Sequence, residues 1–208
     1  MEKASSERKK HWETVYSQKA APETSWYQRE PTLSLAMIQN AQVGADEAII
    51  DIGGGASLLT DSLLQSGYRD ISVLDISGKA LEQARKRLGP NAGRVRWIEE
   101  DVTRFRAERK YAVWHDRAAF HFLTDEDSRR RYRDALYRAL GPGGQAIIAA
   151  FAPDGPRRCS GLDIVRYDAD SLMAVLGDEL ILLEREREIH LTPQNREQRF
   201  GFYRLRRK

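Results

Sequence analysis

The stretch from Ala48 to Leu64 constrains the fold of this chain more than any other. It opens with an apolar run over 48–52, continues through three glycines at 53–55, and ends in leucines at helical spacing. A short apolar run is typical of a strand buried in a parallel sheet, and the leucine spacing favours a helix. A glycine turn between the two lets the backbone approach a ligand closely. We therefore expect a ligand-binding strand–loop–helix unit here.

The rest of the chain continues the alternation of strands and helices. The pattern predicts strands at 70–75, 95–98, 111–114 and 145–151, and helices over 77–88, 125–140 and 170–176. The end differs, because 180–191 and 199–205 flank a turn at 192–195 and predict a hairpin with one antiparallel strand. The fold class is therefore α/β: a doubly wound, mixed, seven-stranded, Rossmann-like sheet with an antiparallel C-terminal hairpin.

Residues 1–44 precede the first strand and carry Trp12, Tyr16, Trp26 and Tyr27 among polar neighbours. Pro31 is a typical entry to a helix over 32–38. We predict that 1–44 form an aromatic, helical lid segment and that 45–208 form the binding domain. Trp26 and Tyr27 would close over the ligand, since such a lid needs rigid apolar surface to exclude water. The alternative is that these rings only dock the segment on the domain.

Composition narrows the class of protein. The 208 residues suit one domain, and a formal net charge of +3 makes nucleic-acid binding the minority interpretation. The single cysteine, Cys159, fits a reducing compartment. No apolar run is long enough for a membrane span, and residues 1–7 lack the apolar core of a signal peptide. We expect a cytoplasmic protein without membrane association, and the oligomeric state stays open.

Three carboxylates stand at the ends of successive predicted strands, namely Asp51, Asp75 and Asp101. In a doubly wound sheet, ligands bind at this edge. A carboxylate at the tip of the second strand, Asp75, can accept both ribose hydroxyls of a nucleoside. Asp101 can accept from an adenine amino group, with Ile76 and Val102 on either side of the ring. Asp51 has the alternative role of bracing its own glycine loop.

Two other nucleotide sites are disfavoured. A dinucleotide fingerprint needs a third glycine three positions after the second, and counted from Gly55 that position is Leu58. A phosphate-binding P-loop is excluded because Gly78 and Lys79 are followed by Ala80 and lack the upstream glycine.

An ordered set of motifs resembles the class I S-adenosylmethionine-dependent methyltransferases over about residues 45–205. The set comprises the loop at 51–57, Asp75, Asp101, the Gly-Pro-Gly-Gly run at 141–144 and the closing hairpin. The resemblance implies a methyltransferase enzyme with S-adenosylmethionine as cofactor. It implies that Gly53, Gly54 and Gly55 face the methionine part, that Asp75 binds ribose, that Asp101 with Val102 binds adenine, and that His115 lies beside the sulfonium.

Two stretches are candidates for contact with the methyl acceptor. In 114–122, His115, Asp116 and His121 are candidate bases, and Arg117 suits an anionic acceptor. His121 has the alternative role of a packed histidine bonded to backbone. In 151–167, Cys159 suits a soft acceptor or fills a buried space, and Tyr167 joins it as a candidate substrate contact. We see no metal cluster and predict no metal.

The acceptor stays open between a small-molecule heteroatom and a protein side chain. The stretch 115–118 resembles the Asp-Arg segment of thiopurine-type methyltransferases that act on small sulfur compounds. The aromatic N-terminus and the loop at 51–57 look like protein-lysine methyltransferases of metabolic enzymes and elongation factors. That branch usually has Asp-Lys-Gly-Thr where this chain has Asp-Arg-Ala-Ala at 116–119. The alternatives are a non-catalytic cofactor-binding interaction module and a nucleic-acid methyltransferase, whose Asn/Asp-Pro-Pro-aromatic motif this chain lacks.

Overall fold

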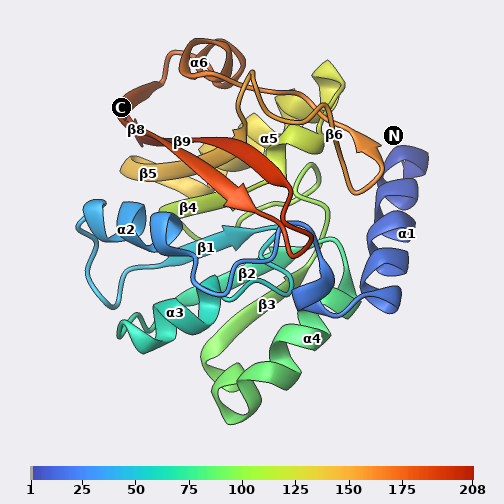
Figure 1. Cartoon of the computed structure of the whole chain (residues 1–208). Coiled ribbons are helices and arrows are strands. Elements are labelled where there is room, and N and C mark those ends of the chain that lie inside the picture. The colour runs from blue at the N-terminus through green and yellow to red at the C-terminus, as the bar shows by residue number, and fades with distance from the viewer. Residues whose placement is uncertain (1) are drawn as a thin grey trace.

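The computed structural model describes residues 2–208, with side chains from Ser5 onward. Its centre is a seven-stranded sheet in the order β3-β2-β1-β4-β5-β9-β8, and β6 and β7 form a separate two-stranded ribbon (Figure 1). The strands from β3 to β5 in that order run parallel, whereas β9 is antiparallel to both β5 and β8. This confirms the predicted mixed sheet and hairpin. The strands are β1 (Ile49–Ile52), β2 (Ile71–Asp75), β3 (Val95–Glu99), β4 (Tyr111–Arg117), β5 (Leu140–Phe151), β6 (Arg158–Cys159), β7 (Leu162–Asp163), β8 (Leu180–Leu191) and β9 (Glu197–Arg207).

Helices cover both faces of the sheet. The helices α2, α3 and α4 pack on one face, and α5 and α6 pack on the other. The helix α1 stands at the edge toward which the arrowhead of β1 points, beside α4 (Figure 1). The helices are α1 (Glu2–Gln18), α2 (Thr32–Asn40), α3 (Leu59–Gln65), α4 (Gly78–Leu88), α5 (Glu126–Ala139) and α6 (Ala169–Leu176), with short 3-10 turns η1 (Ala21–Glu23), η2 (Gly89–Arg94) and η3 (Phe120–Phe122).

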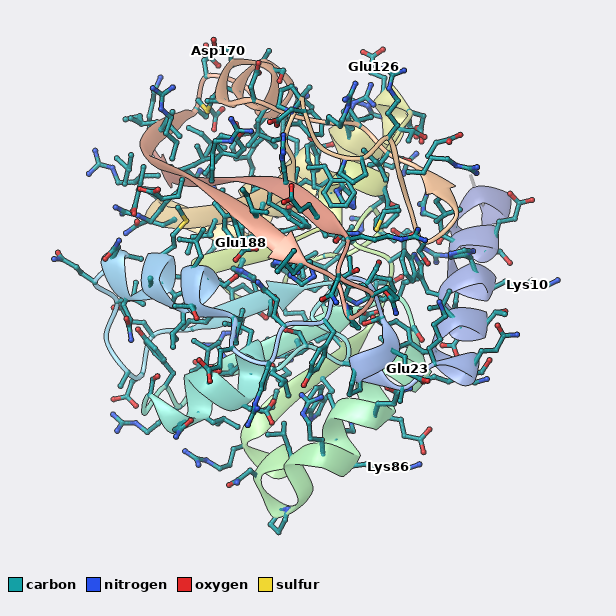
Figure 2. All side chains as sticks on the ribbon, in the orientation of Figure 1. Lys10, Glu23, Lys86, Glu126, Asp170 and Glu188 are labelled. Atoms are coloured by element: carbon teal, nitrogen blue, oxygen red, sulfur yellow. The ribbon has the colours of Figure 1, made fainter. Side chains whose placement is uncertain are left out.

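Charged side chains occupy the periphery of the molecule. Lys10 on α1, Lys86 on α4 and Asp170 on α6 point outward in Figure 2. None of the described helices is long and apolar enough to cross a membrane. Within the predicted lid segment 1–44, α2 instead buries Met37 and Ile38 completely in the core of the sheet domain.

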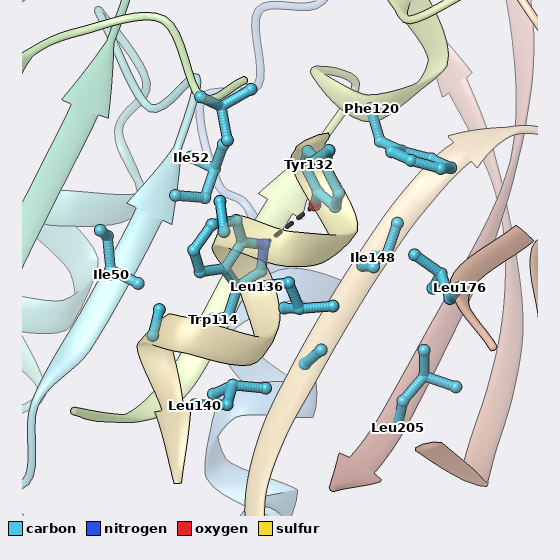
Figure 3. Packing of buried hydrophobic residues seen from close by; sticks show 14 of the residues in the cluster. Ile50, Ile52, Trp114, Phe120, Tyr132, Leu136, Leu140, Ile148, Leu176 and Leu205 are labelled. Atoms are coloured by element: carbon cyan, nitrogen blue, oxygen red, sulfur yellow. Dashed lines mark hydrogen bonds between the residues drawn. The ribbon is translucent and has the colours of Figure 1, made fainter. Parts of the chain in front are cut away.

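The apolar run of β1 is explained by burial on both sides of the sheet. Ile49 packs with the residues of α2 and α3, whereas Ile50 and Ile52 pack with those of α5. In the apolar cluster that contains Ile50 and Ile52, the indole Nε1 of Trp114 donates a hydrogen bond to the hydroxyl of Tyr132 at 2.9 Å (Figure 3). A strand covered by helices on both faces loses the polar alternation of a half-exposed strand.

Side-chain caps begin two of the helices. The Ser77 hydroxyl accepts the N–H of Ala80 at α4, and the Asp125 carboxylate accepts the N–H of Ser128 at α5. The sequence did not predict α1 or the β6–β7 ribbon. The helix α1 is strongly polar, so its pattern lacks the apolar stripe of a core helix, and contacts with distant loops hold it.

Candidate active site

The order of the strands reverses between β1 and β4, and this is where an α/β sheet binds ligands. Two pockets lie at this edge. The first pocket extends from Asp75 and Asp101 to Cys159, and the second lies over the glycine loop beside Asp51. The residues that line both pockets, which we call the junction, are Tyr16, Trp26, Ile52, Gly53 and Arg117.

The glycine loop has a conformation that side chains would obstruct. Gly53 and Gly55 have φ values of +65° and +29°, which favour glycine. A Cβ atom on Gly55 would lie 2.5 Å from a carboxylate oxygen of Asp75. Gly53 and Gly54 line the pockets, whereas Gly55 does not and instead packs against Asp75. The three glycines therefore bring the end of β1 against the end of β2.

Asp75 is a buried carboxylate at the tip of β2. It is 5 % exposed, it lines the first pocket next to Ile76, and its Oδ1 accepts the N–H of Ser77 at 2.8 Å. Burial raises the pKa of Asp75 to about 7, against the hydrogen bond from Ser77, and the charges of Asp51 and Glu13 raise it further. This site therefore disfavours the ionised carboxylate until a donor reaches its second oxygen.

Asp101 follows β3 and lies in the same pocket beside Val102. Its Oδ1 accepts from the backbone N–H and the hydroxyl of Thr103 at 2.9 and 2.8 Å, and its Oδ2 accepts from Arg8 at 2.8 Å. Burial alone would raise the pKa of Asp101, but the hydrogen bonds from Arg8, Ser5 and Thr103 outweigh burial and lower it. Asp101 is therefore held ionised by α1.

The roof of the first pocket is aromatic and comes largely from the N-terminal segment. Trp12 and Tyr16 of α1 line it together with Trp26. The ring of Trp12 meets Trp26 edge-on at 5.5 Å between centroids and Phe122 at 5.0 Å. Glu13, on the same helix, accepts the N–H of Gly78 at 2.6 Å. The predicted lid position of Trp26 agrees with this placement, whereas Tyr27 lines only the second pocket.

His115 links β4 to β1 and α2 rather than reaching freely into a pocket. Its Nδ1 lies 2.7 Å from Asp51 Oδ1, and its Nε2 lies 2.9 Å from the hydroxyl of Ser34. The order Ser-His-Asp matches that of a hydrolytic triad, and Ser34, which is 2 % exposed, lines the second pocket with His115 and Asp51. The second oxygen of Asp51, Oδ2, is buried and has no partner among the described residues. The chain of hydrogen bonds fixes the Asp51 carboxylate beside the second pocket.

Two predicted catalytic residues, Asp116 and His121, line neither pocket. Asp116 is fully buried and accepts the hydroxyl of Tyr132 at 2.7 Å and the N–H groups of Ala119 and Phe120. Burial raises its pKa to about 6 against these hydrogen bonds. Burial, with the charge of Arg117, lowers the pKa of His121 to about 3. The structure therefore does not bring these two groups to a bound ligand.

Arg117 and Cys159 do reach the pockets. Arg117 donates to the carbonyl of Trp26 at 3.1 Å and to Glu188 of β8 at 3.3 Å, and its guanidinium lies 4.5 Å from the ring centre of Phe200. Its Nε has no hydrogen-bond partner among the described residues. Cys159 lines the first pocket from β6, and burial raises its pKa to about 11, so it is a neutral thiol at physiological pH.

The third predicted substrate residue, Tyr167, lies away from both pockets. It is 2 % exposed and packs against Phe120 on the α5 side of the sheet. Sequence reasoning also missed site residues from elements remote in the chain. Arg8, Trp12 and Tyr16 recur every four residues, a spacing that would have indicated one helix face. Nothing local indicated that Glu188 would pair with Arg117.

Comparison with known proteins supports the predicted methyltransferase. A family model described as "Methyltransferase domain" matches residues 49–144, which hold the glycine loop, Asp75 and Asp101. This match and the solved structures below support the predicted class I S-adenosylmethionine-dependent methyltransferase. The N-methyltransferase NodS of Bradyrhizobium japonicum, solved with S-adenosylhomocysteine, superposes with a TM-score of 0.72 at 18 % identity, covering 94 % of this chain and 97 % of NodS. A structure from work on a disulfide-to-thioacetal conversion in echinomycin biosynthesis gives a TM-score of 0.78 at 17 % identity, covering 97 % and 93 %. These two likenesses concern the fold alone.

The curated relatives are longer than this chain. An eEF1A lysine and N-terminal methyltransferase of Bos taurus is 25 % identical over 149 residues, which are 68 % of this chain and 21 % of that protein. A malonyl-[acyl-carrier protein] O-methyltransferase of Ilyobacter polytropus is 29 % identical over 104 residues, 50 % of this chain and 37 % of that one. The chain thus spans about a fifth and about a third of these relatives' lengths.

The methyltransferase pockets fit S-adenosylmethionine, the cofactor of the class. Asp75 presents a buried carboxylate, the side chains of Ile76 and Val102 form apolar wall, and the unpartnered Oδ2 of Asp51 suits an ammonium group. Among the described residues, no group of three or more potential metal ligands could hold a metal ion. The predicted absence of a metal from the reaction stays a prediction.

Proposed function

We propose that this chain transfers the methyl group of S-adenosylmethionine to a heteroatom of a small molecule bound at the junction. The cofactor supplies a methyl group on a positively charged sulfur, which the lone pair of the acceptor displaces. The observation that carries the proposal is that the two pockets adjoin and share five lining residues, Tyr16 and Trp26 among them. A junction lined by the aromatic side chains of Tyr16 and Trp26 suits a small acceptor, because such side chains can surround the acceptor and exclude water from it.

The cofactor-binding residues divide by chemistry. Asp75 accepts the ribose hydroxyls, and Asp101 with Ile76 and Val102 binds the adenine. Gly53 and Gly54 face the methionine part, with Gly55 supporting the loop from behind. The Oδ2 atom of Asp51 accepts the ammonium group, and His115 with Ser34 holds that carboxylate in position. Trp26 covers the cofactor from the side of the roof. Support for this division comes from the burial and the pocket positions of these side chains.

A protein amine is the second candidate acceptor, because relatives at 25 % identity are named as eEF1A lysine and N-terminal methyltransferases. The two acceptors differ in what they require. A protein side chain needs an open groove for the flanking backbone, whereas Arg8, Trp12 and Tyr16 of α1 line the first pocket and narrow the space for it.

Calorimetry with S-adenosylmethionine and S-adenosylhomocysteine tests the cofactor, and a screen with tritiated cofactor tests the acceptor. We expect binding of both nucleosides and tritium in low-molecular-weight products. Absence of binding to either nucleoside would refute the methyltransferase assignment for the chain. If the cofactor binds but tritium is recovered only in protein, the result would favour the second candidate acceptor, a protein amine. Retained binding without any turnover would favour a non-catalytic cofactor-binding module.

A further inference from the structure

Among the five junction residues, Arg117 is the one with a cationic side chain. Arg117 has a side chain that is 10 % exposed, and it lines both pockets. The carbonyl of Trp26, the carboxylate of Glu188 and the ring of Phe200 hold the guanidinium on three sides. These contacts leave its Nε without a partner, although a guanidinium has five N–H donors. A buried donor without an acceptor is costly unless a ligand completes its hydrogen bonds.

The same junction offers no proton acceptor for the reaction. Tyr16 is the titratable junction residue besides Arg117, and Cys159 lines the first pocket nearby. Burial raises the pKa of both, so both are protonated at neutral pH. His115 uses one ring nitrogen on Asp51 and the other on Ser34. Among the described residues, the other bases predicted from the sequence, Asp116 and His121, lie outside both pockets. The carboxylates of Asp51, Asp75 and Asp101 do line the pockets, but the proposed function assigns them to the cofactor. An acceptor that must lose a proton before it attacks therefore has no dedicated partner among the junction residues.

We propose that the methyl acceptor is a carboxylate, which Arg117 binds at the junction and which is methylated on oxygen. This inference rests on the proposed function and names its substrate class. A carboxylate is ionised at neutral pH without help from a base, and its planar pair of oxygens matches the guanidinium fork. One carboxylate oxygen binds Arg117, and the other attacks the methyl carbon.

The reaction balances without proton transfer. A C–O bond forms between the carboxylate and the methyl carbon, the S–C bond breaks, and its electron pair remains on sulfur. An anion and a sulfonium cation become a neutral ester and a neutral thioether. Because the reactants lose their opposite charges, removing water from around the carboxylate favours the transition state. The apolar walls made by Trp26, Ile52 and Phe122 supply such a dehydrated place.

Amines and thiols fit this junction less well. A protonated amine would place a second cation beside Arg117, and it needs a base before it can attack. A thiol also needs to lose a proton, and no described group at the junction accepts one. Glu188 does not take the place of the carboxylate substrate at the Nε of Arg117. One of its oxygens accepts from a terminal nitrogen of Arg117 at 3.3 Å, and the other accepts from Gln28.

The first experiment identifies the bond formed. The full chain with tritiated S-adenosylmethionine is offered hexanoate, hexylamine and hexanethiol, and phenylacetate, phenethylamine and phenylmethanethiol, after cofactor binding has been verified by calorimetry. A low-molecular-weight metabolite extract is tested alongside. We expect tritium to be incorporated into the carboxylates or into a compound of the extract. Alkali should release this tritium as volatile methanol, which marks a methyl ester. Label only in alkali-stable products would overturn the proposal, as would no labelled ester in any sample. Failure of the cofactor to bind would instead overturn the proposed function.

The second experiment assigns the carboxylate to Arg117. We expect Arg117→Gln to raise the KM for the labelled carboxylate about thirtyfold or more, and Arg117→Lys to raise it less. The Kd of S-adenosylhomocysteine should change by less than about threefold. Arg157→Gln, at an exposed arginine, is the control that should leave both unchanged. If the variants weaken S-adenosylhomocysteine and the carboxylate equally, Arg117 belongs to the cofactor site and the proposal fails.

Loss of Arg117 could destabilise the fold by leaving Glu188 buried without its partner. The double variant Arg117→Gln with Glu188→Gln removes both charges and serves as the folded comparison, verified by its thermal transition. The pH profile of kcat at saturating cofactor gives an independent readout. The groups facing Arg117 are Glu188 and His190 from β8, Cys159 from β6 and His121 from η3. We expect kcat to stay flat from about pH 6 to about pH 9, and a rise across that range would reveal a base and overturn the proposal.

Discussion

Asp75 combines two properties that a free surface carboxylate lacks. Burial raises its pKa to about 7, and one oxygen already accepts the N–H of Ser77. A pair of ribose hydroxyls would donate to the remaining acceptor positions and favour the charged form. The position at the tip of β2 was predictable from the sequence, because an acid after a buried strand lies at the carboxyl edge. The perturbed pKa was not, because it depends on Asp51 and Glu13, which other elements bring near.

Replacing Asp75 tests its role toward the ribose. We expect Asp75→Ala to weaken S-adenosylhomocysteine binding by about 2 kcal/mol, a rise in Kd of about thirtyfold, because two hydroxyls lose a charged acceptor. Asp75→Asn keeps the shape and loses the charge, so it should fall between the wild type and Asp75→Ala. Calorimetry measures both Kd values. An unchanged Kd in both variants would contradict the assignment.

Binding of the cofactor should depend on pH through Asp75. Below about pH 7 its carboxyl is neutral in the free protein, and ribose hydroxyls favour the ionised form. The Kd of S-adenosylhomocysteine should therefore rise about tenfold for each pH unit below about 7, and level off above it. In the free protein the same raised pKa means that stability is lost, not gained, as pH rises through about 7. Calorimetry across this pH range should show the pH dependence of Kd in the wild type and not in Asp75→Asn. An equal pH dependence in both proteins would assign it to another titratable group.

Asp116 is a structural group by its contacts. Its carboxylate joins Tyr132 of α5 to the N–H groups that begin η3. We expect Asp116→Ala to lower the free energy of unfolding by about 3 kcal/mol, because three buried donors lose their acceptor. Tyr132→Phe should cost about 1 to 2 kcal/mol, and exposed Asp178→Ala less than about 0.5 kcal/mol. Urea unfolding measures all three; full stability with abolished turnover in Asp116→Ala would restore the catalytic prediction.

The helix α1 is held to the sheet domain by polar contacts and by the aromatic roof. Arg8 binds Asp101, Lys9 binds Glu99, and Glu13 caps the start of α4. All three partners lie at the carboxyl ends of strands, beside the cofactor pocket. The helix therefore closes the site through contacts that can break singly, each worth little in water. We expect α1 to move when a nucleoside enters, because Trp12 and Tyr16 line the pocket.

Removing Arg8 should loosen the closure. The ion pair with Asp101 is partly buried, so Arg8→Ala should speed dissociation of S-adenosylhomocysteine about fivefold, equivalent to about 1 kcal/mol. Lys10→Ala is the matched control, because Lys10 points away from the molecule in Figure 2. Stopped-flow fluorescence of the nearby tryptophans follows the release. Equal rates in the two variants would show that Arg8 does not hold the site closed.

Two large apolar clusters meet at the sheet, and a small third cluster around Tyr16 lies at the site, where the sheet ends. Ile147 and Phe200 belong to one cluster, and Ile148 and Leu205 belong to the other. Residues of both clusters line the pockets, Leu74 from β2 and Leu59 from α3 among them, so the pocket walls are continuous with the core. Binding of a ligand to the folded state alone must then stabilise the entire domain.

A thermal and exchange experiment tests this coupling. S-adenosylhomocysteine at about a hundred times its Kd should stabilise the chain by about 2.7 kcal/mol and raise its Tm. Hydrogen exchange should slow over α1 and the loop after β1, where the bound ligand suppresses local opening. It should also slow in the centre of β5, where exchange requires global unfolding and follows the added stability. A raised Tm without added protection in α1 would contradict the view that this helix closes on the cofactor.

The glycine loop, the acids after β1, β2 and β3, and the terminal hairpin could be predicted from the sequence, because φ preference, strand burial and turn chemistry are encoded within a few neighbouring residues. The tertiary structure was needed for contacts between residues far apart. Arg8 and Asp101 are 93 positions apart, and Arg117 and Glu188 are 71 apart. Such pairs leave no local pattern, since they form only when separate elements pack. The same packing sealed Asp116 and His121 away from the pockets and left the junction between Gly53 and Arg117 without a base.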